Sequence, residues 1–282
     1  MNLHVFNDSH GFVLNVTVDR FEKAGALGNN QFINLRQKTI YKNNRVTYLK
    51  KNLRTYKRFV TNCGDIDSVT FYPLDDTAAW FFKEFIKVKP GIRVYWVFWS
   101  YEFYHTPGRR ELLFDQYSTT YYSQQQTIIT QIKRMGTIAV KKLIGIPYHN
   151  QKLLNEAWRQ VNTFFSFLPQ DYKNVFSEVK SDCTYSPISF LSIEKITNGL
   201  KLAGIGCKIM VGHAASPTAN HAEIFEQLSR IGINNNIVIP LEYGEAQYRH
   251  KIKQIASGLF PNQVEFLENR LSMTEYYQKL SD

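Results

Sequence analysis

The sequence predicts an α/β protein in which short buried strands alternate with helices around parallel sheets. Three observations predict this fold class. Short apolar runs, such as residues 3–6 and 236–241, are bounded by polar residues, Gly or Pro. Residues 93–99 are apolar on both faces, as in the central strand of a covered sheet. Residues 207–211 form an apolar run that ends at Gly212, followed by small residues and a helical pattern.

The first 200 residues supply most of the expected elements. Apolar runs predict strands at 3–6, 31–35, 69–72, 93–104 and 161–165. Helical spacing predicts helices at 13–27, 75–85, 112–122 and 126–143, and one beginning at 169–176. The helix at 75–85 carries acids in its first turn, which suits the positive end of the helix dipole. Residues 183–187 begin the crossing to a second domain, and Gly199, Gly204 and Gly206 mark the approach.

The remaining residues predict a βαβαβα unit. Strands are expected at 207–211, 236–241 and 263–267, and helices after 218, at 246–259 and from Thr274 onward. Thr218 is the expected N-cap of the first of these helices. We therefore expect two Rossmann-like domains, 1–200 and 201–282, with the boundary near 190–204, since 282 residues can bury two cores.

Composition narrows the class of protein. Three cysteines, Cys63, Cys183 and Cys207, show no CxxC spacing, which favours a reducing compartment and gives no sign of a metal site. There is no signal peptide, and the apolar runs are far shorter than the roughly 20 residues of a spanning helix. A cytoplasmic protein is therefore expected. Its net charge is +10, but no nucleic-acid-binding motif accompanies that charge.

The positive charge is concentrated in one stretch of the first domain. Residues 36–58 hold nine cations and no acid, among them Lys50, Lys51, Arg54, Lys57 and Arg58. Such a stretch favours an anionic membrane surface, where each cation contributes ~1 kcal/mol. The alternative is a solvated loop or hairpin face. An amphipathic basic helix at 126–143 could also rest on a membrane, although an apolar stripe of this spacing is more often core.

Two strand ends carry candidate chemistry. The turn at 7–11 follows the first strand, where α/β proteins place ligand contacts. The turn after residue 211 offers backbone N–H groups and a helix N-terminus, which together suit a phosphate or diphosphate. Most strand-turn-helix units bind nothing, so this pattern alone leaves a purely structural turn open.

Three motifs resemble glycosyltransferase family 56. Residues 211–221 resemble its V-G-N-S-x-x-P-T-N-N-H stretch, with His213, Ala214 and Ala219 replacing the usual Asn, Ser and Asn. Residues 99–104 resemble its W-G-x-[DE]-[LF]-Y signature, with Ser100 in place of Gly. Residues 240–244 resemble its P-L-S-Y-G turn, with Glu242 replacing Ser.

The resemblance implies a metal-independent hexosyltransferase of the GT-B arrangement, two Rossmann-like domains facing across a cleft. It implies transfer of a fucose-like or acetamido-dideoxy sugar from a TDP- or GDP-linked donor to a lipid-linked or surface-polysaccharide precursor. The acceptor would lie at the inner face of a bacterial cell membrane, and no cofactor is implied. The expected donor contacts are Gly212, His213, Ser216, Thr218, His221, Pro240, Glu242, Tyr243 and Gly244.

Glu102 is the expected catalytic residue. A carboxylate among aromatic rings at the end of a central strand has its pKa raised toward the range useful to a general base, which would take the proton of the acceptor hydroxyl. The alternative is a glutamate that caps or orients a neighbouring loop.

The second domain looks incomplete beside the family, whose members continue past the position of Asp282. A rival expectation is therefore a degenerate, non-catalytic protein that binds anionic membranes or partner enzymes.

Overall fold

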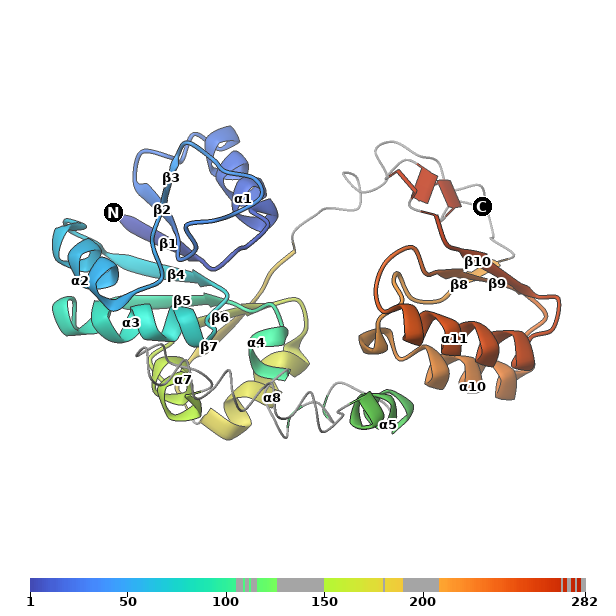
Figure 1. Cartoon of the computed structure of the whole chain (residues 1–282). Coiled ribbons are helices and arrows are strands. Elements are labelled where there is room, and N and C mark those ends of the chain that lie inside the picture. The colour runs from blue at the N-terminus through green and yellow to red at the C-terminus, as the bar shows by residue number, and fades with distance from the viewer. Residues whose placement is uncertain are drawn as a thin grey trace. The chain divides into compact units, whose positions relative to one another are not determined.

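The computed structural model describes residues 1–104, 109, 112, 116–125, 150–179, 181–189, 208–269, 271, 272, 275, 276, 278 and 279. The chain divides into two units (Figure 1). Unit 1 comprises Met1–Pro107 and Gln131–Ile188, and unit 2 comprises Gly108–Thr130 and Ser189–Asp282. This division departs from the expected boundary at 200/201, because residues 108–130 group with the C-terminal unit.

Unit 1 is built on a seven-stranded sheet in which every pair of neighbouring strands is parallel. Its strands are β1 (Asn2–Phe6), β2 (Asn30–Asn34), β3 (Val46–Tyr48), β4 (Ser68–Tyr72), β5 (Arg93–Val97), β6 (Thr163–Ser166) and β7 (Thr184–Pro187). Their order is β3-β2-β1-β4-β5-β6-β7. The chain thus reverses its direction of growth between β1 and β4, as in doubly wound sheets. The predicted α/β class is confirmed.

Helices cover both faces of this sheet. They are α1 (Phe12–Lys23), α2 (Leu53–Asn62), α3 (Asp76–Val88), α4 (Tyr101–Tyr104), α7 (Gln151–Trp158) and α8 (Pro169–Val179). Helix α1 lies on the opposite face from α2 and α3, which lie side by side (Figure 1). Aromatic side chains fill the core: Phe71 packs edge-on against Phe82 of α3, and Trp96 stacks on Trp158 of α7. Burying such large rings is a major stabilising contribution to the unit.

Three expectations for unit 1 were wrong in detail. The strand expected at 93–104 ends at Val97, and Glu102 lies in the short helix α4. The basic stretch is neither a plain loop nor a hairpin, because it contains β3 and most of α2. Residues 184–187, expected to begin the crossing, form the seventh strand. In each case the local residues suit several conformations, and pairing with a neighbouring strand or packing on the sheet decided between them.

Unit 2 contains a three-stranded parallel sheet of order β10-β9-β8. Its strands are β8 (Lys208–Met210), β9 (Asn236–Pro240) and β10 (Val264–Leu267). Helices α10 (His221–Ile231) and α11 (Ala246–Leu259) pack together on one side of this sheet (Figure 1). Their buried residues form one core cluster, which includes Phe225, Ile239 and Tyr248. The predicted alternation of strands and helices in this unit is confirmed through β10.

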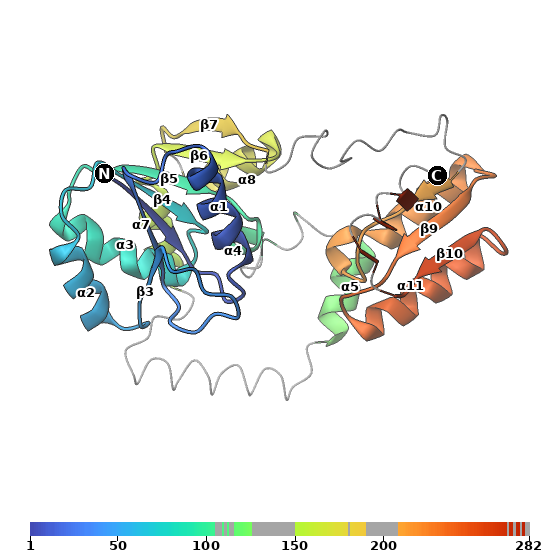
Figure 2. The ribbon, with the colours of Figure 1, turned by 90° about the horizontal axis from the view of Figure 1, so that it is seen from above.

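A helix from the middle of the chain belongs to unit 2. Helix α5 (Gln116–Gln125) contacts α10, and Tyr117 packs against the core cluster of the unit (Figure 2). The sequence predicts a helix here, but not that it packs in unit 2. Its own residues do not indicate which element it packs against. Several expected features lie outside the described residues: Cys207, the helix at 126–143, the boundary at 190–204, the glycines that mark its approach, and Thr274.

Candidate functional site

Two turns of unit 2 lie side by side at the carboxyl edge of its sheet. The first follows β8 and the second follows β9, and an isolated parallel bridge joins Ala215 to Gly244. The Ala215 N–H donates to the Tyr243 carbonyl over 2.7 Å, and the Glu245 N–H donates to the Ala215 carbonyl over 2.8 Å. The expected adjacency of these turns is confirmed, and it follows from two consecutive parallel strands. We call residues 211–218 and 240–245 the paired turns.

Two glycines are needed for close contacts at the paired turns, Gly244 between the two turns and Gly212 against His221. Gly244 has φ 114°, and a Cβ placed there would lie 2.3 Å from the Ala215 carbonyl oxygen. Gly212 has φ 75°, and a Cβ placed there would lie 2.3 Å from Nε2 of His221. Any larger side chain would therefore clash at either position, besides adopting a disfavoured backbone conformation. Both glycines position the paired turns.

The imidazole of His221 is fully buried beneath the first turn. Its Nδ1 lies 3.4 Å from the hydroxyl of Tyr248, and its ring centroid lies 6.0 Å from that of Phe225. With its ring against Gly212 and no exposed surface, His221 acts here as a positioning residue. His221 is one of the expected donor contacts, but without exposed surface it could act on a ligand only indirectly, by supporting Gly212.

Four other predicted residues lie on the outer side of the paired turns. His213 and Thr218 are exposed, Ser216 is partly exposed, and Tyr243 is 56% exposed. The rings of His213 and Tyr243 come from different turns, and their centroids lie 6.3 Å apart. The fold thus brings together an imidazole, a phenol and two hydroxyls at one sheet edge. These groups are able to hydrogen bond a phosphate and to stack on a base.

The expected N-cap at Thr218 was wrong. Pro217 to Ala219 form a short 3-10 turn, in which the Ser216 Oγ accepts from the Thr218 N–H over 3.4 Å. Asn220, with φ 47°, is the N-cap residue of α10. The first turn engages part of its own N–H groups, since those of Ala215, Ser216 and Ala219 bond to the carbonyls of Tyr243, Ala214 and Ser216. A ligand at this edge would therefore meet the N–H groups near Gly212 and His213 and not those of the whole turn.

The second turn places Pro240 and Glu242 inward. Pro240 is buried at the end of β9, in register with Leu267 of β10. Oε1 of Glu242 is buried and has no hydrogen-bond partner among the described residues. The nearby Arg249 donates from Nη2 to the Glu242 carbonyl over 3.4 Å. Burial first, and then the Glu242 charge, raises the pKa of Tyr243.

Helix α5 supplies a support that sequence reasoning missed. Ser118 is fully buried and donates from Oγ to the Pro217 carbonyl over 3.0 Å. This bond ties the first turn to a residue 99 positions earlier in the chain. No local sequence signal reports a pairing of this kind.

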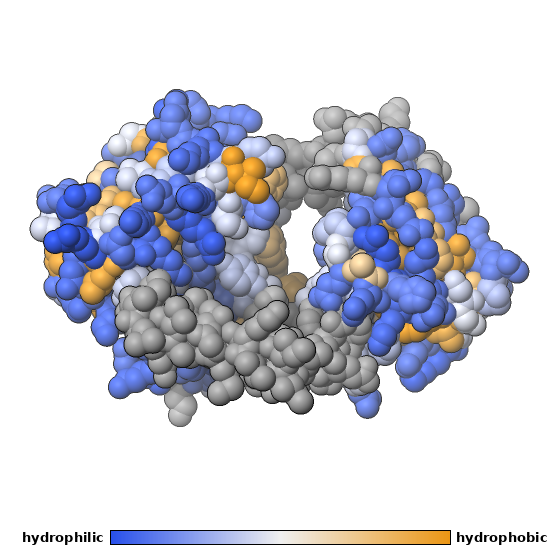
Figure 3. All heavy atoms as spheres, viewed as in Figure 1, coloured by the Kyte–Doolittle hydropathy of each residue, from blue (hydrophilic) through white to orange (hydrophobic). Residues whose placement is uncertain are grey.

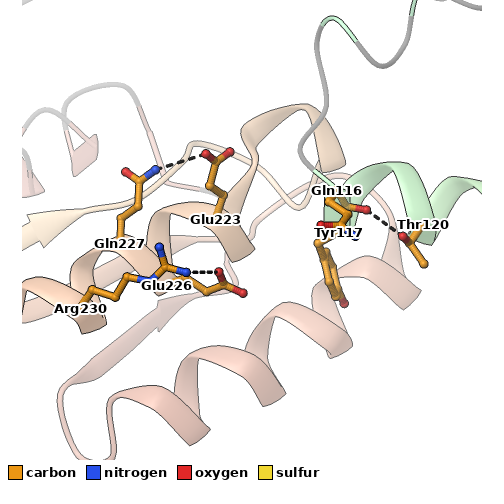
Figure 4. Close-up of a pocket in the computed structure, with 7 residues that line it drawn as sticks. All are labelled: Gln116, Tyr117, Thr120, Glu223, Glu226, Gln227 and Arg230. Atoms are coloured by element: carbon orange, nitrogen blue, oxygen red, sulfur yellow. Dashed lines mark hydrogen bonds and ion pairs between the residues drawn. The ribbon is translucent and has the colours of Figure 1, made fainter.

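A groove of about 540 Å³ lies between α5 and α10 (Figure 4). Gln116, Tyr117 and Thr120 line one side, and Glu223, Glu226, Gln227 and Arg230 line the other. The α10 side chains pair along their own helix, with Gln227 donating to Glu223 and Arg230 bridging to Glu226. None of the seven lining residues belongs to the paired turns. The carboxylates of Glu223 and Glu226 would repel a diphosphate in this groove.

A second cluster lies in unit 1, where the carboxyl ends of β1 and β4 meet. The Asn7 amide donates from Nδ2 to the Asp75 carboxylate over 2.6 Å, and Arg36 donates from Nε to Asn7 Oδ1 over 2.8 Å. The Tyr101 hydroxyl lies 3.5 Å from the same carboxylate. This point of reversal in strand order is where open α/β sheets bind ligands. We call Asn7, Arg36, Asp75 and Tyr101 the reversal cluster.

The turn expected to contact ligands at 7–11 is held by its own acid. Asp8 Oδ1 accepts from the N–H groups of His10 and Gly11 over 2.9 and 2.8 Å, and Oδ2 accepts from that of Leu14 over 3.3 Å. The buried Asn34 donates to the Asp8 carbonyl. Asp8 therefore fixes the start of α1. Asn7 is the residue of this turn that belongs to the reversal cluster. Its place at the carboxyl end of the first strand was the only sequence signal for such a contact.

Glu102 is buried against β5 with 5% of its surface exposed. Its Oε1 accepts from Nε1 of Trp96 over 3.1 Å and from the Trp99 N–H over 2.9 Å. Its Oε2 is buried and has no hydrogen-bond partner among the described residues. Burial is the main cause that raises the pKa of Glu102 to about 8, and the charge of Asp75 adds to it. The expected direction of the pKa shift is confirmed, whereas the catalytic role stays a prediction.

The predicted membrane cations follow the carboxyl end of β3. Lys50, Arg54 and Arg58 are exposed; Lys51 donates to the Thr77 hydroxyl over 2.6 Å, and Lys57 lies 4.0 Å from Glu84. Tyr56 and Val60 of the same helix are buried. Helix α2 therefore presents a basic outer face. Both membrane attachment and a merely solvated surface are compatible with such a face.

Comparison with known proteins gives distant structural likenesses. No protein-family model matches the chain, and no curated protein matches its sequence. MurG from Acinetobacter baumannii is similar over 97% of this chain and 68% of its own, with 10% identity and a TM-score of 0.45. E. coli heptosyltransferase WaaC with ADP is similar over 99% of this chain and 78% of its own, with 11% identity and a TM-score of 0.31. At this distance the function has to be argued from the residues of the chain itself, and membership of glycosyltransferase family 56 stays a prediction.

Two kinds of feature are absent from the described residues. Among them, no group of three or more His, Cys, Asp or Glu side chains is placed to hold a metal ion. None of the helices described is long and apolar enough to cross a bilayer.

Proposed function

We propose that this protein is a glycosyltransferase that uses a nucleoside-diphosphate sugar as donor. In the proposed reaction a fucose-like or acetamido-dideoxy sugar moves to a lipid-linked or surface-polysaccharide precursor. The proposal takes unit 2 as the donor side and unit 1 as the acceptor side of a GT-B arrangement. The specific sugar, the acceptor and the position at the inner face of the cell membrane rest on the resemblance of three motifs to glycosyltransferase family 56.

The observation that carries the proposal is the pair of hydrogen-bonded turns at the carboxyl edge of unit 2. Gly244 lets these turns touch, Gly212 leaves room for the imidazole of His221, and α10 begins directly after the first turn. A diphosphate at this edge would meet the remaining N–H groups of the first turn and the positive end of the α10 dipole. Such donors can neutralise a departing diphosphate.

The exposed residues of the paired turns receive separate roles. The hydroxyls of Ser216 and Thr218 lie 2.8 Å apart, so one of the two would donate to a phosphate oxygen, and Tyr243 would stack on the base. Their neighbour His213 would contact the same ligand. His221, Gly212 and Gly244 would position these groups, as their packing supports.

In unit 1 we propose that Glu102 is the general base. Its raised pKa suits proton removal near neutral pH, and Oε2 has no other hydrogen-bond partner among the described residues. The reversal cluster would hold the acceptor sugar through its amide, guanidinium and hydroxyl groups. The exposed cations that follow β3 would attach the protein to the anionic surface that carries a lipid-linked acceptor.

Calorimetric titration of the full chain with thymidine diphosphate and guanosine diphosphate tests the donor site. Thr218→Asp places a negative charge beside the N-terminus of α10 and should weaken binding at least tenfold. Tyr243→Ala should weaken it about 5- to 150-fold, since base stacking is worth ~1–3 kcal/mol and 1.4 kcal/mol is tenfold. Asn234→Asp is the control, because it adds the same charge just before β9, at the opposite edge of the sheet.

Equal affinity of the wild type and Thr218→Asp would show that the paired turns are only a connection between strand and helix. If the wild type binds neither nucleotide, the non-catalytic alternative gains.

A further inference from the structure

Three large apolar side chains stand out of the carboxyl edge of unit 1. Phe12 is 69% exposed, Ile40 64% and Tyr41 63%. They come from two segments that the fold holds together, since the Ile40 N–H donates to the Ser9 carbonyl over 3.2 Å and the Tyr41 N–H to the His10 carbonyl over 3.0 Å. We call Phe12, Ile40 and Tyr41 the apolar tip.

The tip is fixed by a steric contact as well. A Cβ added to Gly11 would lie 2.1 Å from the Tyr41 carbonyl oxygen, so the two backbones touch at this position. Gly11 has φ 84° and is the N-cap residue of α1. The three side chains are therefore presented from rigid backbone.

Packing within unit 1 gives no reason for the exposure of these side chains. Helix α1 buries Leu14 and Val18 against the sheet, whereas Phe12 at its first position stays outside. Ile40 and Tyr41 lie in the connection from β2 to β3, and residues 35–45 form neither helix nor strand. A parallel crossover is usually a helix that covers the sheet. Here it is an open segment that carries apolar residues outward.

The surroundings of the tip are positively charged. Lys38 and Lys42 flank Ile40 and Tyr41, and both are exposed. Lys50 follows β3 at the same edge of the sheet and is also exposed. Asp8 is the nearest acid in the first segment, and backbone N–H groups bind both of its carboxylate oxygens. Glu22 is paired with Arg45 over 2.5 Å.

Exposed aromatic and aliphatic side chains with flanking lysines match the surface of an anionic bilayer. The apolar groups enter the boundary between headgroups and acyl chains, and the lysines meet the lipid phosphates. Most of the visible face of the described residues is hydrophilic, with small apolar patches, one of them on unit 1 near α1 (Figure 3). A uniformly negative surface complements neighbouring lysines such as Lys38 and Lys42 better than a protein surface of mixed charge does.

We propose that the apolar tip, with Lys38 and Lys42, is the surface through which this protein docks on anionic membranes. The inference deepens the membrane attachment named under the proposed function, and it assigns insertion to Phe12, Ile40 and Tyr41. It differs from attachment by charge alone, which would require only the cations of α2.

Sedimentation with lipid vesicles tests the docking surface in the full chain. One set of vesicles contains equal parts of phosphatidylglycerol and phosphatidylcholine, and the other contains phosphatidylcholine alone. A double variant, Ile40→Ser with Tyr41→Ser, should bind the anionic vesicles at least tenfold more weakly than the wild type. Lys38→Gln with Lys42→Gln should weaken that binding roughly 30-fold, since each cation contributes ~1 kcal/mol and 1.4 kcal/mol is tenfold.

Two controls keep the outcomes separate. Ile231→Ser removes a side chain of unit 2 that is 75% exposed and should leave binding unchanged. The triple variant Arg54→Gln, Lys57→Gln and Arg58→Gln removes the charge of α2 and should weaken binding less per cation than the loss of Lys38 and Lys42. All substituted residues of the tip are exposed, and unfolding followed by tryptophan fluorescence verifies that the variants fold.

Wild-type binding by Ile40→Ser with Tyr41→Ser would overturn the proposal, and attachment by charge alone would remain. Failure of the wild type to bind either vesicle would also overturn it. Neither result bears on the nucleotide titration, so the proposed sugar transfer stands or falls separately.

Discussion

Replacing Glu102 by Gln should change how the stability of unit 1 depends on pH. Burial raises the folded-state pKa of this carboxyl to about 8 from an ordinary value of 4.5. Between these two pH values the folded unit holds a proton that the unfolded chain has released. Stability from this group is therefore fully present below pH 4.5 and is lost as the pH rises toward 8. Gln does not titrate and removes this dependence.

The magnitude follows from the two pKa values. Each pH unit inside the window costs ~1.4 kcal/mol, so between pH 5 and pH 7 the wild type should lose roughly 2–3 kcal/mol relative to Glu102→Gln. The amide keeps an acceptor for Trp96 and the Trp99 N–H. Its NH₂ replaces the buried Oε2, a cost of ~1–3 kcal/mol that does not vary with pH. The comparison of slopes therefore isolates the titration.

Urea unfolding followed by tryptophan fluorescence is the assay. Trp80, Trp96, Trp99 and Trp158 are the four tryptophans of the chain, and all belong to unit 1, so the signal reports that unit. Glu156→Gln, on the exposed face of α7, is the matched control and should keep the wild-type slope. Equal slopes for the wild type and Glu102→Gln would refute the argument, because Glu102 would then be ionised in the folded protein.

The same variant separates catalysis from structure. A general base with this pKa gives a turnover that rises with pH up to about 8, and its loss typically costs ~10²–10⁴-fold. Wild-type turnover in Glu102→Gln would leave Glu102 as an orienting residue of the turn between β5 and α4.

Two further predictions concern the stability of unit 1. Ser100→Gly should raise the free energy of unfolding in urea by about 0.5–1 kcal/mol, because Ser100 adopts φ 68°, where glycine has no steric cost. An unchanged or lower stability would contradict the strain argument. His4 is buried, and burial lowers its pKa from 6.5 although its hydrogen bond to Asn30 raises it. Below pH 6.5 the unfolded chain takes up a proton that the folded unit resists, so stability falls with falling pH, and His4→Gln should lose less between pH 6.5 and pH 5. Identical acid sensitivity in His4→Gln would show that the imidazole titrates normally.

Much of the fold could be predicted from local pattern. Most of the parallel strands were found, among them β1, β4 and β9, and α11 was predicted with its observed bounds, whereas β3 and β7 were missed. The adjacency of the paired turns also followed from sequence, because right-handed crossovers place the ends of consecutive parallel strands at one edge.

The errors have physical causes that lie outside the local pattern. Residues 98–104 are aromatic and suit a strand, but Phe98 and Phe103 are buried in the core, and α4 folds back on β5. Thr218 has the chemistry of an N-cap, yet Pro217 favours a 3-10 turn and moves the helix start to His221. Local propensity was outweighed by tertiary packing in both places.

The partners in the reversal cluster and the support from α5 could not be predicted, although the turn that carries Asn7 was. Asn7 meets Asp75 across 68 positions, and Ser118 meets Pro217 across 99. Polar pairs at such separations leave no periodic signal. A parallel sheet fixes which strand ends are neighbours only once the strand order is known, and that order became evident from the pairing of β1 with both β2 and β4.

The segment from Trp99 to Tyr104 shows how a signature can serve structure and chemistry together. Ser100 turns the chain through a left-handed conformation, and Glu102 then bonds back to Trp96 and Trp99. Tyr104 donates to Asp171 over 2.9 Å and accepts from Asn174 over 2.9 Å, which anchors the segment to α8. These bonds use Oε1 of Glu102 and leave Oε2 buried without a partner among the described residues. The bonds that hold the turn need only an acceptor at Oε1, which an amide also supplies. A carboxyl with its second oxygen unengaged can also exchange a proton, and the turnover of Glu102→Gln decides whether that proton is used in catalysis.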